Sequence, residues 1–177
     1  LDLSANSIKE AKKHQKTGLQ FFEHDMRNAY KDNYAHYIFN LFTSFGYFDN
    51  EEDNITTLKH IYNTLKYDGI LVIDYLNPDY ITQHFPVTER KTVKGIDFKI
   101  EKFCDDQFIY KNIIFEDDGQ KFSFQEKVQR ISGDLFSQWL SQCGFTIEKV
   151  FGDYQLKKYH ETDSPRQIII AKKESLD

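Results

Sequence analysis

Two nearly continuous apolar runs with a helical pattern between them constrain this chain more than any other feature. The runs are "HYIFNLFTSFGYF" at residues 36–48 and "ILVIDYL" at residues 70–76. Unbroken apolar runs of this length are typical of strands that are covered on both faces. The stretch between them predicts a helix over about 50–69. Acids fill its first turn, Ile55, Leu58 and Ile61 recur at helical spacing, and Gly69 is expected to end it. Strand, helix and strand in this order favour an α/β domain with a mainly parallel sheet.

The flanking segments extend this alternation. Residues 1–3 read as the end of a strand, followed by a helix that Ser4 caps and that runs to about His14. "LQFFEHD" at 19–25 predicts another buried strand. Near the C-terminus, a helix at 133–143 ending at Gly144 precedes strands at 145–151 and 166–173. No helical pattern joins these last two strands, so we expect them to be antiparallel. The tail "KKESLD" is expected to be loose.

A different pattern occupies residues from about 82 to 131. Segments such as "DFKIEKFCD", "QFIYKNIIFED" and "KFSFQEKVQRI" alternate apolar and polar residues, and the turn "EDDGQK" separates the last two. Such alternation is typical of antiparallel strands with one face in water. We therefore predict one domain over 1–177, a Rossmann-like sheet with a C-terminal antiparallel pair and an antiparallel β insertion at 82–131.

Composition excludes several classes of partner. The chain has 177 residues, 40% of them hydrophobic, and a formal net charge of −5. This charge gives no electrostatic footprint for nucleic acid or an anionic membrane, and no apolar run is long enough for a membrane span. Cys104 and Cys143 have no metal-ligand spacing and are expected to be reduced, as in a cytoplasmic protein. The histidines are scattered, so no metal site is predicted.

Three acids stand at the ends of predicted strands: Asp2, Asp25 and Asp74. In open α/β sheets, ligands bind outside the carboxyl ends of the strands, where an acid can accept hydrogen bonds from ribose hydroxyls or an exocyclic amine. The alternative for each acid taken alone is that it caps the following helix or turn. The three together favour a nucleoside ligand.

The order of the motifs is similar to that of class I S-adenosylmethionine-dependent methyltransferases. "LDLSANSIKEAKKH" resembles the second strand of that family and "LQFFEHDMRN" its next motif. "IFNLFTSFGYFDNEED" and "TLKYDGILVIDYLNP" resemble its fourth strand, the following helix and its fifth strand. "FQEKVQRI", "CGFTIEKVFGDY" and "DSPRQIIIAKK" are similar to the end of a branch that methylates small molecules and carries an antiparallel insertion. The resemblance spans nearly the whole chain.

The resemblance implies S-adenosylmethionine as cofactor and a set of residues that bind it. Asp2 would bind the ribose hydroxyls with Leu3 beside the adenine. Asp25 would accept from the adenine amino group, with the Met26 amide near it. Asn40 and Leu41 would line the methionine portion. The chain departs from the family pattern in two ways: His36 replaces the usual acid at the start of the fourth strand, and no glycine-rich turn is present.

The missing glycine turn and the strand that normally precedes it lead to a further expectation. By resemblance, that strand lies between the second and fourth strands, and without it two buried strands would each have an unpaired edge. We therefore predict an upstream segment on the order of 40–60 residues, one βαβ unit with a lead-in. Direct pairing of the strands that end near Asp2 and Asn40 would contradict this prediction.

Candidate acceptor contacts follow from position alone, and no catalytic residue is assigned. Tyr47 follows the fourth strand and Asn77 the fifth, while Arg130, Tyr154 and Arg166 lie in the closing portion. An arginine here can clamp a carboxylate or phosphate, or can tie the insertion to the sheet. Tyr154 can cover the site or simply pack, and Trp139 is predicted to be core.

The predicted function is methyl transfer from S-adenosylmethionine to a small-molecule acceptor. The alternative from another class is a non-catalytic methyltransferase-like domain that binds a ligand or partner, which the missing glycine turn favours. A nicotinamide-dependent oxidoreductase fits less well, because the closing strand pair is antiparallel. The acceptor and the oligomeric state stay open, a dimer being one possibility.

Overall fold

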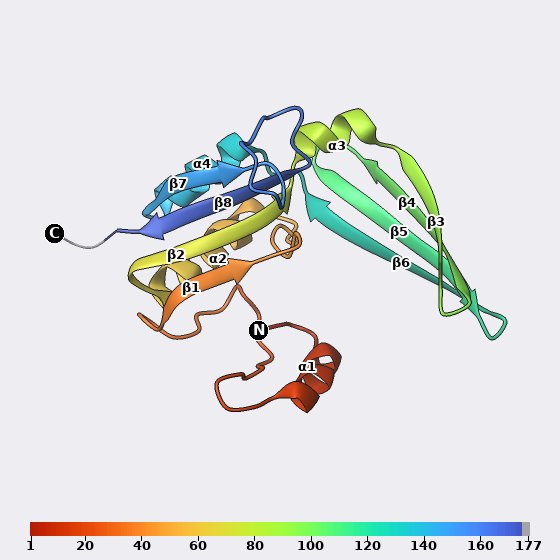
Figure 1. Cartoon of the computed structure of the whole chain (residues 1–177), viewed down its shortest axis with the longest axis horizontal. Coiled ribbons are helices and arrows are strands. Elements are labelled where there is room, and N and C mark those ends of the chain that lie inside the picture. Colours follow the sequence, from red (N-terminus) through yellow and green to blue (C-terminus); the bar gives the residue numbers. More distant parts are fainter. Residues whose placement is uncertain (175–177) are drawn as a thin grey trace.

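The computed structural model describes residues 1–174 and contains two four-stranded sheets (Figure 1). The main sheet has the order β1 (Ala35–Asn40), β2 (Leu65–Leu76), β8 (Arg166–Lys173), β7 (Phe145–Phe151). β1 and β2 are parallel, whereas β8 is antiparallel to both β2 and β7. The predicted C-terminal antiparallel pair is confirmed. Only one of the three hydrogen-bonded pairs of this sheet is parallel, so the sheet is mixed and not mostly parallel in its pairing.

Two helices cover one face of the main sheet. α2 (Glu51–Thr64) and α4 (Gly133–Gln142) lie behind it in Figure 1. The α2 helix begins at the Asn50 cap, whose side chain accepts from the Asp53 amide. Ser132 caps α4, and Gly144 follows it with φ of +90°, as expected for a helix end. Between helices and sheet lies a core that includes Leu58, Leu71, Phe136 and the predicted core residue Trp139.

The end of α2 differs from the prediction. The helix stops at Thr64, and Gly69 lies inside β2 instead of terminating the helix. The reason is tertiary. The ammonium of Lys173, on the distant strand β8, donates to the carbonyls of Tyr62 and Leu65 at distances of 2.9 and 2.8 Å. This side chain satisfies carbonyls that the helix end leaves open, and burial lowers its pKa.

β1 is not covered on both faces in the described chain. Tyr37 and Phe39 expose 64% and 60% of their area and stack with ring centroids 6.4 Å apart. The strand pairs only with β2, and its other edge is open. Its apolar run correctly indicated a strand, but the expectation of two covered faces was wrong for this structure.

The N-terminal segment is mostly irregular. The helix capped by Ser4 is confirmed as α1 (Ala5–Ala11), followed by a 3₁₀ turn η1 (Lys12–His14). The strands predicted at 1–3 and 19–25 are wrong: a single parallel bridge joins Asp2 to Glu23. A strand needs a neighbour along its length, and in the described chain the segment at 19–25 has only this bridge and a second one from Leu19 to Lys16. Asp2 and Asn40 are not paired, so the result that would have contradicted the upstream-segment prediction does not occur.

The predicted antiparallel insertion is present as the second sheet, which we call the wing. Its strands follow chain order: β3 (Val87–Val93), β4 (Ile96–Cys104), β5 (Phe108–Asp117) and β6 (Gln120–Gln129). The sequence indicated the last three strands and the turn at Asp118–Gly119, but missed β3 and the short helix α3 (Pro78–His84). β3 was missed because its residues are mostly polar and exposed, so it carries little apolar alternation.

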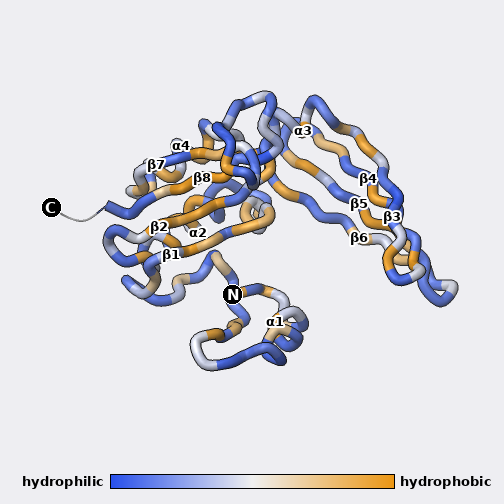
Figure 2. Tube along the Cα trace, viewed as in Figure 1, coloured by the Kyte–Doolittle hydropathy of each residue, from blue (hydrophilic) through white to orange (hydrophobic). Residues whose placement is uncertain are grey.

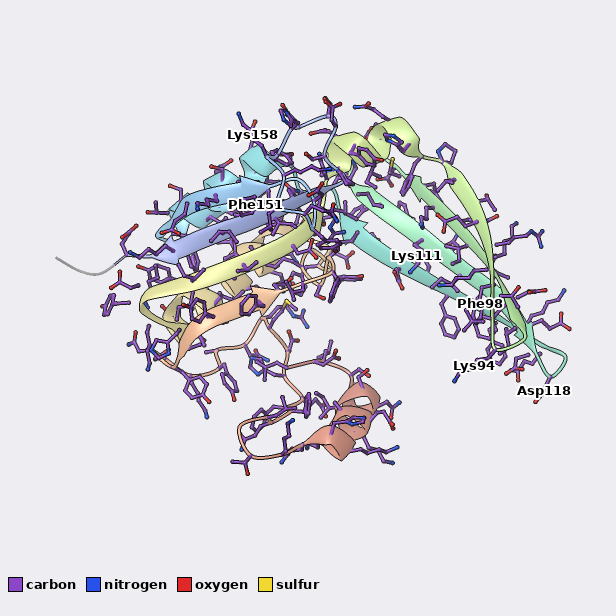
Figure 3. The ribbon with its side chains drawn as sticks, viewed as in Figure 1. Lys94, Phe98, Lys111, Asp118, Phe151 and Lys158 are labelled. Atoms are coloured by element: carbon purple, nitrogen blue, oxygen red, sulfur yellow. The ribbon has the colours of Figure 1, made fainter. Side chains whose placement is uncertain are left out.

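Hydropathy separates the two sheets in Figure 2. The tube is apolar along much of β8, whereas apolar and polar positions alternate along the wing strands. The wing projects away from the main sheet, and its hairpin turns at Lys94 and Asp118 lie at the far end (Figure 3). The tail prediction was partly wrong, since Lys172 and Lys173 belong to β8; residues 175–177 lie outside the described chain.

Candidate functional site

A buried ionic network organises the carboxyl end of β2. Asp74 is 2% exposed, and its Oδ1 accepts from Nε of Arg166 at 2.7 Å and from the terminal nitrogen at 2.6 Å. Its Oδ2 accepts from the Phe42 amide at 2.8 Å and from the Tyr154 hydroxyl at 3.1 Å. A carboxylate removed from water needs such complete pairing. Asp74 therefore connects the loop after β1, strand β8 and the loop that carries Tyr154.

This network holds a strained turn directly after β1. Phe42 and Thr43 have φ of 58° and 60°, a left-handed conformation that residues with a side chain rarely adopt. Such a residue costs on the order of 1–3 kcal/mol unless its surroundings fix it. The Thr43 amide donates to the Asp74 carbonyl, and the Thr43 hydroxyl accepts from Leu76 and Arg166. The turn consequently holds the exposed Phe42 ring at the carboxyl edge of the sheet.

A groove of about 730 Å³ lies along the open edge of β1. The N-terminal segment forms its other wall, with Leu1, His24 and Met26 among the lining residues. Asn40, the last residue of β1, also lines it, and its Oδ1 is buried without a hydrogen-bond partner in the described chain. Buried acceptors are normally satisfied, so this oxygen can accept from a ligand that enters the groove.

The predicted cofactor residues fall into two groups. Asn40 and Met26 line the groove, whereas Asp2, Leu3, Asp25 and Leu41 are not among its lining residues. The bridge between Asp2 and Glu23 brings the two N-terminal motifs together. One Asp2 oxygen accepts from the Ser4 amide at 2.7 Å, so Asp2 caps the turn that leads into α1, while the Ser4 side chain caps the helix itself. The structure thus supports the turn-capping alternative for one carboxylate oxygen of Asp2.

Asp25 has a strong partner within its own turn. Arg27 donates to both carboxylate oxygens of Asp25, with the shortest distance 2.6 Å. These bonds and the Arg27 amide lower the pKa of Asp25 to about 2. The carboxylate is therefore ionised near neutral pH, but much of its accepting capacity is already used.

Of the five predicted acceptor contacts, two are open to solvent. Tyr47 and Tyr154 are exposed by 51% and 58%. Partial burial raises the pKa of Tyr47, with a smaller contribution from Glu126 on the wing. Tyr154 lies over the Asp74–Arg166 pair, with the Arg166 guanidinium 5.8 Å from its ring centroid. Both hydroxyls therefore stay protonated near neutral pH and can donate or accept at this edge.

The side chains of Asn77, Arg130 and Arg166 form structural contacts within the protein. Asn77 is fully buried and its amide donates to the carbonyls of Glu161 and Ser164 while its oxygen caps α3. Arg130 donates to the Asp105 carbonyl and the Thr82 hydroxyl, which ties the wing to α3. Both arginines therefore make structural contacts and do not stand free to bind an anion. Arg166, however, links β8 to β2, whereas the prediction was a link between the insertion and the sheet.

Sequence reasoning missed the strained turn at Phe42 and Thr43. No sequence pattern indicates a left-handed backbone conformation at Phe42 and Thr43, because neither residue is glycine or asparagine. Asp74 was identified as a strand-end acid, but its partner Arg166 lies 92 positions away, and only the fold brings the two together. His36, the departure from the family pattern, lies 3.4 Å from the ammonium of Lys66 at the start of β2.

Comparisons with known proteins bear on the family and the fold of this chain. No protein-family model matches the chain. A glycine/sarcosine N-methyltransferase of Aphanothece halophytica is 30% identical over 133 residues, which are 74% of this chain and 49% of that protein. The chain thus spans about half the length of this curated relative.

Solved structures show the same fold over nearly the whole chain. An S-adenosylmethionine-dependent methyltransferase from Clostridium acetobutylicum has a TM-score of 0.85 at 19% identity, covering 98% of this chain and 74% of that one. The amino pentose methyltransferase from Micromonospora echinaspora, solved with S-adenosylmethionine bound, has a TM-score of 0.72 at 13% identity, with 96% and 71% covered. The chain has the fold of the class I S-adenosylmethionine-dependent methyltransferases, and the resemblance seen in the sequence is confirmed.

Proposed function

We propose that this chain is part of an enzyme that transfers a methyl group from S-adenosylmethionine to a small molecule. The observation that carries the proposal is the buried, unpartnered Oδ1 of Asn40 in the groove at the carboxyl end of β1. The methionine portion of the cofactor has an ammonium group that can donate to such an oxygen. In an α/β sheet this edge is the place where ligands bind.

The chain's own residues would hold the cofactor along this edge. Asn40 and Leu41 would line its methionine portion, and a carboxylate oxygen of Asp2 would accept from the ribose, with Leu3 beside the adenine. Met26 lines the groove on its N-terminal side, where its amide would meet the ring. Asp25 can accept from the adenine amino group only if it shares its oxygens with Arg27, which makes its contribution the weakest of the set.

Residues of the chain would act mainly by positioning the reactants. S-adenosylmethionine supplies an activated methyl group, so transfer needs an in-line approach of the nucleophile and exclusion of water. The rigid turn at Phe42 and Thr43 presents an apolar ring at this edge. Tyr47 and Tyr154 would contact the acceptor, while Asn77, Arg130 and Arg166 hold the loops around it. A protonated nucleophile would need a base, and we assign none.

Small amines are the acceptors we propose first. The names of two relatives refer to glycine or sarcosine and to an amino pentose, all of which contain an amine. A neutral amine is itself a nucleophile, so a site without an assigned base suits it. A panel of glycine, sarcosine and amino sugars, with product mass as the readout, would test this class against carboxylate and hydroxyl acceptors.

Calorimetry on the natural protein tests the cofactor proposal. We expect micromolar binding of S-adenosylmethionine and S-adenosylhomocysteine, weakened at least tenfold by Asn40→Ala, because its oxygen then no longer accepts from the ligand. Asn112→Ala on the wing is the matched control and should leave binding unchanged. Absence of binding to either compound would overturn the proposal. Binding without methylation of any acceptor would favour the non-catalytic alternative.

The open edge of β1 supports a proposal about the domain. We propose that another strand of the natural protein pairs with this edge, covers Tyr37 and Phe39 and fills the groove along β1, which leaves only the end of the groove at Asn40 for the cofactor and completes the domain predicted over 1–177. Hydrogen exchange of the β1 amides in the natural protein tests it: slow exchange on both edges is expected, and fast exchange on the open edge would contradict it. A cytoplasmic location is also proposed, and no helix in residues 1–174 is both long and apolar enough to cross a bilayer.

A further inference from the structure

One face of the wing is apolar and carries no covering element. Directly opposite residues of neighbouring antiparallel strands share a face. The pairings Phe98–Phe115–Phe122 and Ile100–Ile113–Phe124 therefore form two apolar rows across β4, β5 and β6 on the same face. We call these six residues and the strand surface around them the open face. No helix of the described chain lies over it (Figure 1), and Phe124 is 55% exposed.

The open face is ordered by its own side chains. The Phe115 ring lies 4.8 Å from Phe98 and 4.9 Å from Phe122, measured between centroids. Figure 3 labels Phe98 and, nearer the main sheet, Lys111, which lies on the same face. At its inner end, the face continues into the molecular core through Ile109 and Val128. The outer half therefore carries a preformed cluster of apolar side chains, and contiguous exposed patches of this kind mark interaction sites.

The size of the open face indicates a protein partner. Four strands about 4.8 Å apart, over about seven residues of about 3.4 Å each, give a face about 19 Å by 24 Å. A small-molecule acceptor would cover only a fraction of this length. Two such faces packed together would bury on the order of 1,000 Å² or more, which is the size of a specific protein interface.

The charges of the open face fit a second copy of the same chain. Lys102 and Lys111 pair with Glu89 and Glu126 within the face, at distances of 2.7 and 3.1 Å. Lys91 and Asp117 add one charge of each sign, so the face has no net charge, whereas the whole chain carries −5. Two acidic chains therefore meet with least repulsion here, and no strongly charged partner is required. Apolar centre and polar rim are the usual anatomy of an interface.

We propose that the open faces of two copies pack together and form a homodimer of this chain. The contact would be sheet against sheet, with Ile100 and Ile113 near its centre and the ionic pairs at its rim. The Gln129 amide, at the end of β6, donates to the carbonyl of Gly46 at 2.8 Å, so the inner end of the face lies close to Tyr47, the next residue, and the second copy would border the proposed acceptor site. The dimer does not depend on the proposed methyl transfer, and either proposal can fail alone.

Light scattering and sedimentation equilibrium test the dimer. We expect the chain to have twice its 21.1 kDa mass at micromolar concentration. Phe124→Glu and Ile113→Lys should halve the measured mass, since each places a charge in the apolar rows. The matched controls are Ser123→Glu and Ile114→Lys, which are the neighbouring residues on the opposite face and should leave the dimer intact.

The folding of each variant is checked separately. Circular dichroism must show the same folded spectrum for each variant and its control, and a variant that fails this is replaced by Phe122→Gln or Ile100→Thr. A monomeric wild-type chain, a Phe124→Glu chain that stays dimeric, or equal dissociation of the controls would each overturn the proposal. A monomer that gains affinity for an apolar small molecule on this face would replace it with a ligand surface.

Discussion

The two sheets of this protein have the same number of strands but opposite relations to solvent. In the main sheet, α2 and α4 cover one face, and Leu71, Ile73 and Ile169 are almost fully buried. In the wing no described helix covers the corresponding rows, and Ile113 and Phe115 stay partly exposed. The difference shows that burial here depends on the elements that cross the sheet. Alternation of apolar and polar residues along a strand places the apolar side chains on one face of the sheet, but another element must pack on that face to bury them.

Removal of a charge is expected to be most costly at the buried ionic network of the main sheet, around Asp74. Asp74→Ala should destabilise the fold by about 3–5 kcal/mol, because it leaves Arg166, the Phe42 amide and the Tyr154 hydroxyl without their partner. Chemical denaturation measures this change in the free energy of unfolding, and a spectroscopic probe on the wing shows whether both sheets unfold together. The double variant Asp74→Ala with Arg166→Met should recover part of the loss, and a loss no greater than about 1 kcal/mol for the single variant would contradict the role of this pair.

Truncation of matched aliphatic residues compares the two sheets directly. Leu71→Ala in β2 should cost about 2–5 kcal/mol because it leaves a cavity in the core. Ile113→Ala in the wing should cost about 1 kcal/mol or less in the monomer, since less area is removed from water there. Urea unfolding at low protein concentration checks both. Equal losses would show that the open face is covered in solution.

A surface ion pair of the wing should matter least among the charged contacts. Lys102 lies 2.7 Å from Glu89, and both side chains are partly in water. Lys102→Met should change the free energy of unfolding by at most about 1 kcal/mol, and salt should reduce this difference. Thermal melts at low and high salt measure it. A salt-independent loss would instead indicate that the pair is buried in an interface.

The smallest expected effect concerns pH at the N-terminal turn. The pKa of Asp25 is lowered from its ordinary 3.8 to about 2 by Arg27. A folded-state pKa below the unfolded value stabilises the fold above the unfolded pKa, and this contribution is lost as pH falls through the folded one. Between about pH 4 and pH 2 the turn should therefore loosen, as an NMR titration of Asp25 would show. Arg27→Ala should return the pKa toward 3.8, and an unchanged pKa would contradict the assignment.

Local patterns predicted the elements whose neighbours are near in sequence. The cap at Ser4, the helix begun by Asn50, the turn at Asp118 and the two closing strands are all present as expected. The segment at 19–25 was mistaken for a strand because its apolar residues fit one, yet in the described chain it forms only two isolated bridges, from Glu23 to Asp2 and from Leu19 to Lys16. β3 was missed for the opposite reason: backbone pairing with β4 creates a strand from residues without a clear pattern.

The candidate site was predictable only as a set of positions. Asn40 and Asp74 were identified because strand ends meet at one edge of a sheet. The occupation of Asn77, Arg130 and Arg166 by structural contacts could not be read from the sequence, because each partner lies tens of residues away along the chain. The same holds for Lys173 of β8, whose ammonium donates to the Leu65 carbonyl directly after α2.

The sequence by itself determined the α/β class, the insertion and the methyltransferase resemblance, because these depend on the order and period of apolar residues. "LDLSANSIKEAKKH" also specified its capped helix locally, through Ser4. Only the tertiary structure decided which side chains remain free to meet a ligand. The carboxylate of Asp74 and the amide of Asn77 have partners within the fold, whereas the side-chain oxygen of Asn40 has none in residues 1–174. Hydrogen-bond partners distant in sequence are fixed by packing, so the chemistry of this edge exists only in the folded chain.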